Sequence, residues 1–244
     1  MKKFLLVCLL TAIISPRFLA QTQFVCDGVN LETVNDSCVY VIGFGNYKYS
    51  GNVVIPEEAT YQDKTYRVTG IASKAFASCT SLLSIQLPSS LQIIESAAFQ
   101  YCSNLKTITL PENLKEIKDF AFFYCTKLSS IIIPNSVTKI GGSAFDRCEA
   151  MTSIKIGTGL TVINASTFGN CYNLTSVKIP ANVKSIKRNA FCECRKLSTV
   201  TIESKETQYD IDAFNKTPYY VAHSKRTNIT VGGRTIPKSR VSVF

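Results

Sequence analysis

Cysteine is the most regularly placed reactive side chain in this sequence of 244 residues, which contains ten cysteines but only one histidine, His223. Six of the cysteines are spaced 23 residues apart: Cys79, Cys102, Cys125, Cys148, Cys171 and Cys194. A thiolate acts as a nucleophile beside a general base, and it binds zinc when other thiolates or imidazoles lie close by. Because one histidine supplies almost no base or ligand, we expect no Ser-His or Cys-His catalytic residues and no metal site.

Other patterns that carry chemistry are also missing. The aspartates and glutamates are scattered and do not recur as a row, which argues against the paired carboxylates of a glycosidase. Cys192 and Cys194 form C-x-C, not the C-x-x-C of zinc ligands, and the sequence has no glycine-rich phosphate loop. We therefore predict a protein that is not an enzyme and that holds no cofactor.

The 23-residue step is shared by apolar side chains, and this recurrence predicts the fold. The most regular series is Phe76, Phe99, Phe122, Phe145, Phe168, Phe191 and Phe214. Further series begin at Leu82, Ile85 and Leu87, so that one unit reads A-F-x-x-C-x-x-L-x-x-I-x-L-P-x-x-L-x-x-I. A period of about 20–29 residues around L-x-x-L-x-L is typical of leucine-rich repeats.

Each part of the unit predicts one element of a coil. The I-x-L alternation predicts a short parallel β-strand with one buried face, and the proline after it ends the strand. A second extended segment contains Leu91 and Ile94. For Ala-Phe-x-x-Cys we expect a short helical turn, with Ser73, Ser96 and Asp119 as N-caps. One coil cannot bury its own apolar face, so the coils must stack into a solenoid.

The stacking also explains the regular cysteines. Coils about 4.8 Å apart place successive thiols in identical core slots, where cysteine behaves as a small hydrophobic residue. We therefore expect buried free thiols in this series. Cys26 and Cys38 lie outside the repeat, in a segment that we expect to meet an oxidising compartment, and we predict a disulfide between them.

With these motifs, residues 50–214 resemble the BspA-like leucine-rich-repeat proteins, which are bacterial surface or secreted proteins associated with adhesion. Residues 51–56 and 66–71 resemble the opening coil of that family, with nine extra residues between Pro56 and Ile71. The pattern fades after Phe214, as expected for an end coil that seals a solenoid. The resemblance implies a non-enzymatic module that binds a partner.

The sequence divides into four regions. Residues 1–20 predict a secretory signal, because Lys2 and Lys3 precede an apolar run too short to span a bilayer. We expect an N-terminal cap in residues 21–50, the solenoid in 51–214, and a C-terminal cap or basic tail in 215–244. The protein should therefore be secreted or on the cell surface, with the periplasm as an alternative, and should not span the membrane after cleavage.

The C-terminal part is basic. Residues 178–244 hold 13 lysines and arginines against 5 acidic residues. The tail itself contains Lys225, Arg226, Arg234, Lys238 and Arg240. A solvated tail is one interpretation, and contact with an anionic surface is the other. We do not expect nucleic-acid binding, because no aromatic residues are interleaved with these charges.

Strand geometry predicts where a partner binds. Residues on either side of the buried isoleucine must face outward. One outward row, called the hydroxyl row below, is Ser84, Thr107, Ser130, Ser153, Ser176 and Thr199. The neighbouring row, called the varied row, is Gln86, Thr109, Ile132, Lys155, Lys178 and Thr201. We predict that Ile132, Lys155 and Lys178 form the centre of the contact with an extracellular protein or glycan.

Two other functions remain open from the sequence. A parallel β-helix enzyme acting on polysaccharides has coils of similar length, but it needs a cluster of acidic or basic residues on one face. A purely structural envelope protein needs no ligand at all. Binding of matrix proteins or glycans separates the structural function from adhesion, and hydrolysis of polysaccharides identifies the enzyme.

Overall fold

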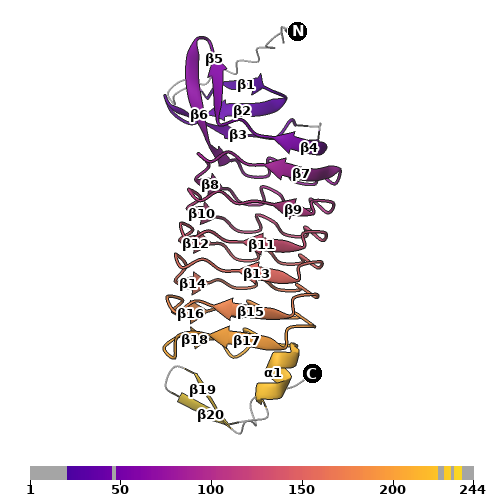
Figure 1. The fold of residues 1–244 in the computed structure, drawn as a ribbon, viewed down its shortest axis with the longest axis vertical. Coiled ribbons are helices and arrows are strands. Elements are labelled where there is room, and N and C mark those ends of the chain that lie inside the picture. Colours follow the sequence, from indigo (N-terminus) through magenta and orange to yellow (C-terminus); the bar gives the residue numbers. More distant parts are fainter. Residues whose placement is uncertain (1–20, 46–47, 225–227, 232–233, 238–244) are drawn as a thin grey trace.

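The computed structural model describes residues 21–45, 48–224, 228–231 and 234–237. The coils stack one on another into an elongated column, with two series of short strands along it (Figure 1). The predicted leucine-rich-repeat solenoid with 23-residue coils is confirmed.

The first strand column contains the I-x-L segments. Its members are β4 (Gly51–Val54), β7 (Leu82–Gln86), β9 (Thr107–Ile108), β11 (Ser130–Ile132), β13 (Ser153–Lys155), β15 (Ser176–Ile179) and β17 (Thr199–Ile202). From β7 onward, the paired strands are parallel with residues 23 apart opposite each other, as for Ile131 and Ile154. Because side chains alternate along a strand, this register gives every coil the same buried and exposed positions.

The second strand column is built from the second extended segment of each coil. Its members are β8 (Ile93–Ile94), β10 (Glu116–Ile117), β12 (Lys139–Ile140), β14 (Val162–Ile163), β16 (Ser185–Ile186) and β18 (Gln208–Tyr209). The last isoleucine of each strand of this column from β8 to β16 faces the core, for example Ile94 opposite Ile117, whereas both residues of β18 are exposed. Two strand columns and one column of turns therefore enclose the interior.

The core is a continuous series of stacked side chains. Phe99, Phe122 and Phe145 are fully buried, and their ring centroids are 5.0 and 5.1 Å apart with nearly parallel planes. The regular cysteines are buried free thiols, as predicted. Side chains of one type can stack this way because each coil repeats the backbone path of the previous one.

The predicted helical turn is wrong, because the Ala-Phe-x-x-Cys segment forms a ladder of turns. The N–H of Phe122 donates to the carbonyl of Ala144 in the next coil at 2.7 Å, while the N–H of Phe123 donates to Phe120 in its own coil at 3.0 Å. An α-helix is about 10 Å wide, so one helix per coil would not fit a stacking distance of about 5 Å. Alternating amides therefore bond between coils and within a coil.

The backbone of these turns is left-handed at two positions per coil. In the third repeat these are Phe120 (φ 59°) and Tyr124 (φ 64°), which flank the buried Phe122. Ser73 and Asp119 consequently do not cap helices. The hydroxyl of Ser73 donates to the carbonyl of Ser96 at 2.9 Å, and a carboxylate oxygen of Asp119 accepts the N–H of Gly142 at 2.6 Å, so both link adjacent coils.

The N-terminal end is closed by antiparallel strands. β1 (Gln23–Cys26), β2 (Val29–Thr33) and β3 (Cys38–Val41) extend the second column through β6 (Lys64–Ile71) in the order β1-β2-β3-β6-β8. The nine extra residues of the first coil lie in the hairpin of β5 (Glu58–Tyr61) and β6. At the other end, α1 (Pro218–Ser224) follows the last coil, and β19 (Asn228–Val231) pairs with β20 (Arg234–Pro237).

In the described part of the chain, Cys26 and Cys38 do not form the disulfide that we predicted. Cys26 pairs with Val29 at the start of β2, whereas Val34, just after β2, donates its N–H to the carbonyl of Cys38 at 2.9 Å. Val34 lies five residues after Val29, which corresponds to about 16 Å along a strand. A disulfide needs Cα atoms within about 7 Å, so this register separates the two cysteines.

Candidate binding surface

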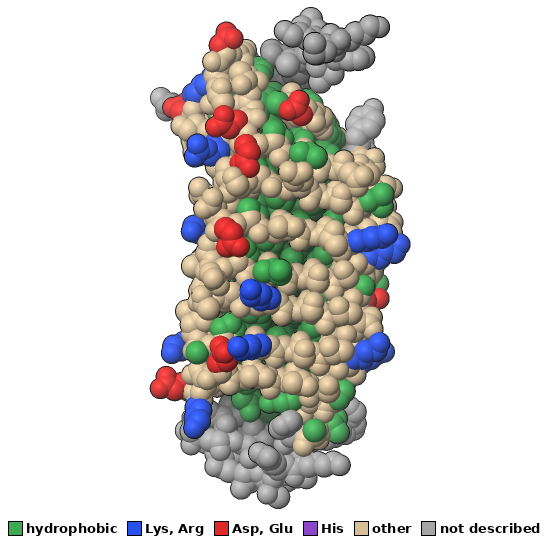
Figure 2. Space-filling model, viewed as in Figure 1, with side chains coloured by type: hydrophobic (Ala, Val, Ile, Leu, Met, Phe, Trp, Pro, Cys, Tyr) green, Lys and Arg blue, Asp and Glu red, His purple; other side chains and the backbone are tan. Residues whose placement is uncertain are grey.

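The outward side of the first strand column, called the strand face below, is a continuous exposed surface over all the coils. Every residue of the varied row is exposed, and so are the residues of the hydroxyl row except Ser84, which is half-buried. Strand pairing places Ser130 beside Ser153 and Ile132 beside Lys155. Figure 2 shows that this face is mostly neutral, with a few basic, acidic and hydrophobic side chains along it.

The structure extends both rows by one position toward the N-terminus. Asn52 pairs with Ser84, and Val54 pairs with Gln86. The Asn52 side chain accepts a hydrogen bond from the Ser84 hydroxyl at 2.7 Å. Neither residue could be assigned to the rows by its spacing, because the β5–β6 insertion separates β4 from the next coil by more than 23 residues.

The apolar centre of the strand face is Ile132. Its side chain is 61% exposed, the largest exposed fraction among the exposed large hydrophobic residues that the structure describes. Lys155 lies next to it in register and forms no ion pair with any described residue. These two residues present an apolar group and an uncompensated positive charge side by side.

Lys178 differs from Lys155, because it is neutralised by an acidic residue of the next coil. Its Nζ lies 2.7 Å from a carboxylate oxygen of Glu203, and this hydrogen bond lowers the pKa of Glu203. The sequence pattern predicts two equivalent lysines and gives no indication of Glu203 as a partner. The varied row therefore becomes less basic toward its C-terminal end than its sequence suggests.

A pocket of about 490 Å³ adjoins the other end of the varied row. Gln86 and Thr109 line it together with Glu57, Glu112 and Asn113. The Glu57 carboxylate accepts the N–H groups of Ser89 and Ser90 at 2.6 and 3.1 Å, and these bonds lower its pKa. The strand face is therefore acidic and polar near Gln86, and apolar with one free positive charge near Ile132.

The titratable side chains of the described residues do not converge on a metal site. No group of three or more histidine, cysteine, aspartate and glutamate side chains is arranged to hold a metal ion in that part of the chain. Burial raises the pKa of the Cys102 thiol to about 12, which makes the thiolate scarce at neutral pH. None of the helices in the described ranges is long and apolar enough to cross a membrane.

The basic tail falls largely outside the described part of the chain, and of the side chain of His223 nothing is described. Lys225, Arg226, Lys238 and Arg240 lie outside the described residues, as does the predicted signal segment. The backbone of Arg234 belongs to β20, and that of His223 belongs to α1. Contact of this tail with an anionic surface stays a prediction.

Similarity to known proteins centres on the repeat. Six copies of a BspA-type leucine-rich-repeat region match residues 69–198. Among solved structures, the leucine-rich-repeat protein of T. pallidum is 30% identical, with 70% of this chain and 78% of that chain aligned at a TM-score of 0.63. No curated protein matches the sequence.

Two similar solved structures are longer than this chain. A leucine-rich-repeat protein of Bacteroides ovatus is 28% identical, with a TM-score of 0.61 and 80% of this chain covered. A leucine-rich cell surface protein of Faecalibacterium prausnitzii is 26% identical, with a TM-score of 0.57 and 75% covered. The match spans 57% and 55% of the lengths of those two proteins.

Proposed function

Because this chain belongs to the BspA-type leucine-rich-repeat family, we propose that it is a non-enzymatic adhesion module that binds an extracellular protein or glycan through the strand face. Proteins of this family are generally non-enzymatic and are typically secreted or on the cell surface. The similar F. prausnitzii protein is described as a cell surface protein, which supports the same location here.

The observation that carries this proposal is the pairing of Ile132 with Lys155 on the strand face. An exposed isoleucine gains about 1.5–3 kcal/mol when a partner removes it fully from water. Lys155 adds a positive charge that no acidic side chain of the described residues neutralises. A partner that places an apolar group beside a carboxylate or sulfate complements this pair.

The remaining residues of the varied row extend the proposed contact in both directions. Lys178 contributes less charge because Glu203 is bound to it, but its aliphatic chain lies on the same row. Gln86 and Thr109 add hydrogen-bonding groups at the acidic pocket. Six coils at about 4.8 Å give a strip about 29 Å long, which suits an extended peptide or a short oligosaccharide.

The test is a binding assay of the full chain against immobilised matrix proteins, mucins and a glycan array. The variant Ile132→Ser/Lys155→Ser/Lys178→Ser should lose binding to whichever probe the parent chain binds, with its melting temperature within a few degrees of the parent. Lys139→Ser is the matched control, since it removes a positive charge from the second strand column. The control should bind like the parent.

Other outcomes of the same assay contradict the proposal. If the triple variant still binds but deletion of residues 225–244 abolishes binding, the basic tail is the site and the strand face is only a scaffold. If no probe binds the parent chain, a structural envelope role replaces adhesion. Release of reducing sugars from polysaccharides would identify an enzyme instead.

A further inference from the structure

The first strand column has an open edge at its N-terminal end. The second column continues past its first coil through β6, β3, β2 and β1, which close it (Figure 1). The first column stops at β4, which pairs with β7 on one side and with no other strand in the described part of the chain. One edge of β4 is therefore available for another strand.

The backbone groups of β4 divide cleanly between its two edges. The N–H of Gly51 donates to the carbonyl of Ser81 at 2.8 Å, and that of Ile55 donates to Gln86 at 3.0 Å, both toward β7. Because backbone groups alternate along a strand, the N–H and C=O groups of Asn52 and Val54 point to the open edge. Within the described ranges, these groups form no hydrogen bond.

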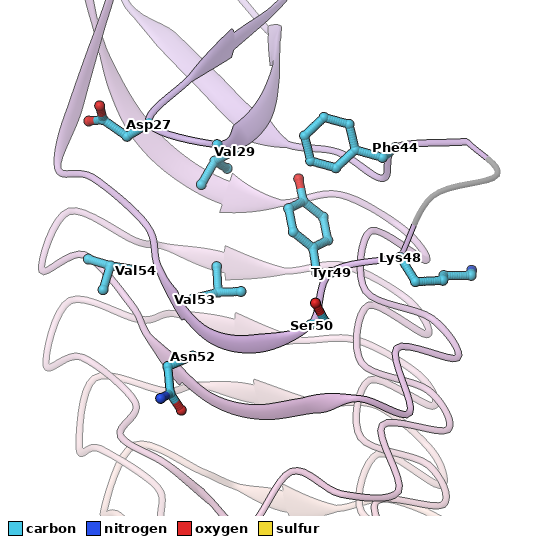
Figure 3. A pocket seen from close by; sticks show the side chains of 10 residues that line it. Asp27, Val29, Phe44, Lys48, Tyr49, Ser50, Asn52, Val53 and Val54 are labelled. Atoms are coloured by element: carbon cyan, nitrogen blue, oxygen red, sulfur yellow. The ribbon is translucent and has the colours of Figure 1, made fainter. Parts of the chain in front are cut away.

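The open edge of β4 borders a pocket of about 600 Å³ between the N-terminal cap and the first coil. Figure 3 shows Val29, Phe44, Tyr49 and Val53 around this space, with Asp27 at one end and the Lys48 side chain directed away. Val29 and Tyr49 are buried, whereas Val54 is 57% exposed. The lining therefore combines these apolar side chains with the polar Ser50 and Asn52 and with the Asp27 carboxylate.

The walls of this pocket are held in place by hydrogen bonds. The Tyr49 hydroxyl accepts the N–H of Asn30 at 3.0 Å and donates to the carbonyl of Ile42 at 2.9 Å. Its ring centroid lies 4.4 Å from that of Phe76, at the top of the phenylalanine stack. A ligand that enters therefore meets a preformed surface, and little ordering is needed on binding.

Exposed strand edges in proteins are usually protected by charge, by proline or by a covering segment. β4 has the sequence Gly-Asn-Val-Val, which contains no charged residue and no proline. The edge also lies beside this partly apolar pocket, so an incoming strand finds both main-chain partners and a place for a side chain. This combination is the arrangement used in recognition by strand addition.

We propose that an extended polypeptide segment of a partner protein docks on β4 as an additional strand and inserts an apolar side chain into the pocket beside Phe44 and Val53. A polypeptide is the ligand class that fits, because it presents N–H and C=O groups at the spacing of Asn52 and Val54. Asp27 favours a lysine or arginine near the inserted side chain. This site uses the main-chain edge of β4, whereas the proposed strand-face contact uses side chains centred on Ile132, so neither depends on the other.

The test selects dodecapeptides from a random display library on the full chain and measures the affinity of the enriched peptides by fluorescence polarisation. Val54→Pro removes the free N–H without removing a bond to β7, and it should weaken binding by about tenfold or more. Val54→Thr keeps the N–H and the branched shape, so this matched control should bind like the parent. Ile132→Ser should also bind normally.

A second measurement keeps the test independent of how the proline variant folds. In the unmodified chain, bound peptide should slow hydrogen exchange at the amides of Asn52 and Val54, and N-methylation of the peptide at alternate residues should abolish this protection. Failure to enrich any peptide overturns the proposal, as does a peptide that leaves both amides unprotected. If only a glycan protects these amides, the ligand of the β4 edge is a sugar and the proposal of a polypeptide is wrong.

Discussion

The thiol of Cys125 donates a hydrogen bond to the carbonyl oxygen of Phe99 in the preceding coil, with an Sγ–O distance of 3.2 Å. The same bond recurs along the column, from Cys102 to Phe76 and from Cys194 to Phe168. The carbonyls of Phe76 and Phe99 also accept the N–H of the cysteine in their own coil, at 3.0 and 3.1 Å. Cysteine therefore fills a core slot and satisfies a buried acceptor.

Replacing Cys125 by alanine should lower the free energy of unfolding by about 1–3 kcal/mol, because the Phe99 carbonyl loses one of its two donors and the slot loses a sulfur atom. Urea denaturation measures the change. Cys192→Ala is the matched control, since Cys192 is half-buried and lies outside the regular series; it should change stability by less than about 0.5 kcal/mol. An equal loss in both variants would contradict the role of the regularly spaced cysteine thiols as buried hydrogen-bond donors.

The stability of the column should fall in alkaline solution. Burial raises the pKa of Cys102 from 9.0 to about 12, so above pH 9 the unfolded chain releases a proton that the folded chain retains. The stabilisation is complete below pH 9, and it is lost as pH rises toward 12, by up to about 1.4 kcal/mol per pH unit for this thiol.

Urea denaturation at several pH values between 9 and 11 measures this effect, and comparison with Cys102→Ala separates it from the titration of lysines and tyrosines. The variant should show a shallower decline than the parent. Identical slopes would show that Cys102 does not retain its proton in the folded chain.

Phe122→Ala should cost about 3–5 kcal/mol, because the ring is fully buried between Phe99 and Phe145 and neither neighbour can move into the space without breaking its own stack. Phe120 provides a control of the same residue type, since its side chain is 45% exposed. Phe120→Ala should cost less than about 1 kcal/mol. A loss below about 1 kcal/mol for Phe122→Ala would contradict the stacking register.

The left-handed turn positions should reject β-branched residues. Lys74 is exposed and has φ 59°, a conformation that asparagine adopts readily and valine does not. We expect Lys74→Val to destabilise the protein by about 1–2 kcal/mol and Lys74→Asn to be tolerated. Lys115→Val, at an exposed site without positive φ, should have little effect on the melting temperature; comparable losses at both sites would refute the strain argument.

Much of the fold could be predicted because the repeat constrains it strongly. A 23-residue recurrence of Phe, Cys, Leu and Ile leaves stacking of equivalent positions as the way to bury them all. The alternation around Ile131 and Ile154 was enough to orient the strand face. The outward positions of Ile132 and Lys155 followed from the same alternation, since a one-residue slip would expose the isoleucines of the core.

The features that only the tertiary structure decided all depend on distances between segments. The turn ladder replaced the expected helical turn because alternate amides of this segment bond to the next coil, a pairing that no single unit reveals. Glu203 neutralises Lys178 because it lies one coil further along, and the register of β1, β2 and β3 keeps Cys26 away from Cys38. The open edge of β4 exists because the cap extends only the neighbouring column. A sequence pattern specifies which faces are apolar. It does not specify which segments pair, because these pairings depend on the positions that distant residues take in the folded chain.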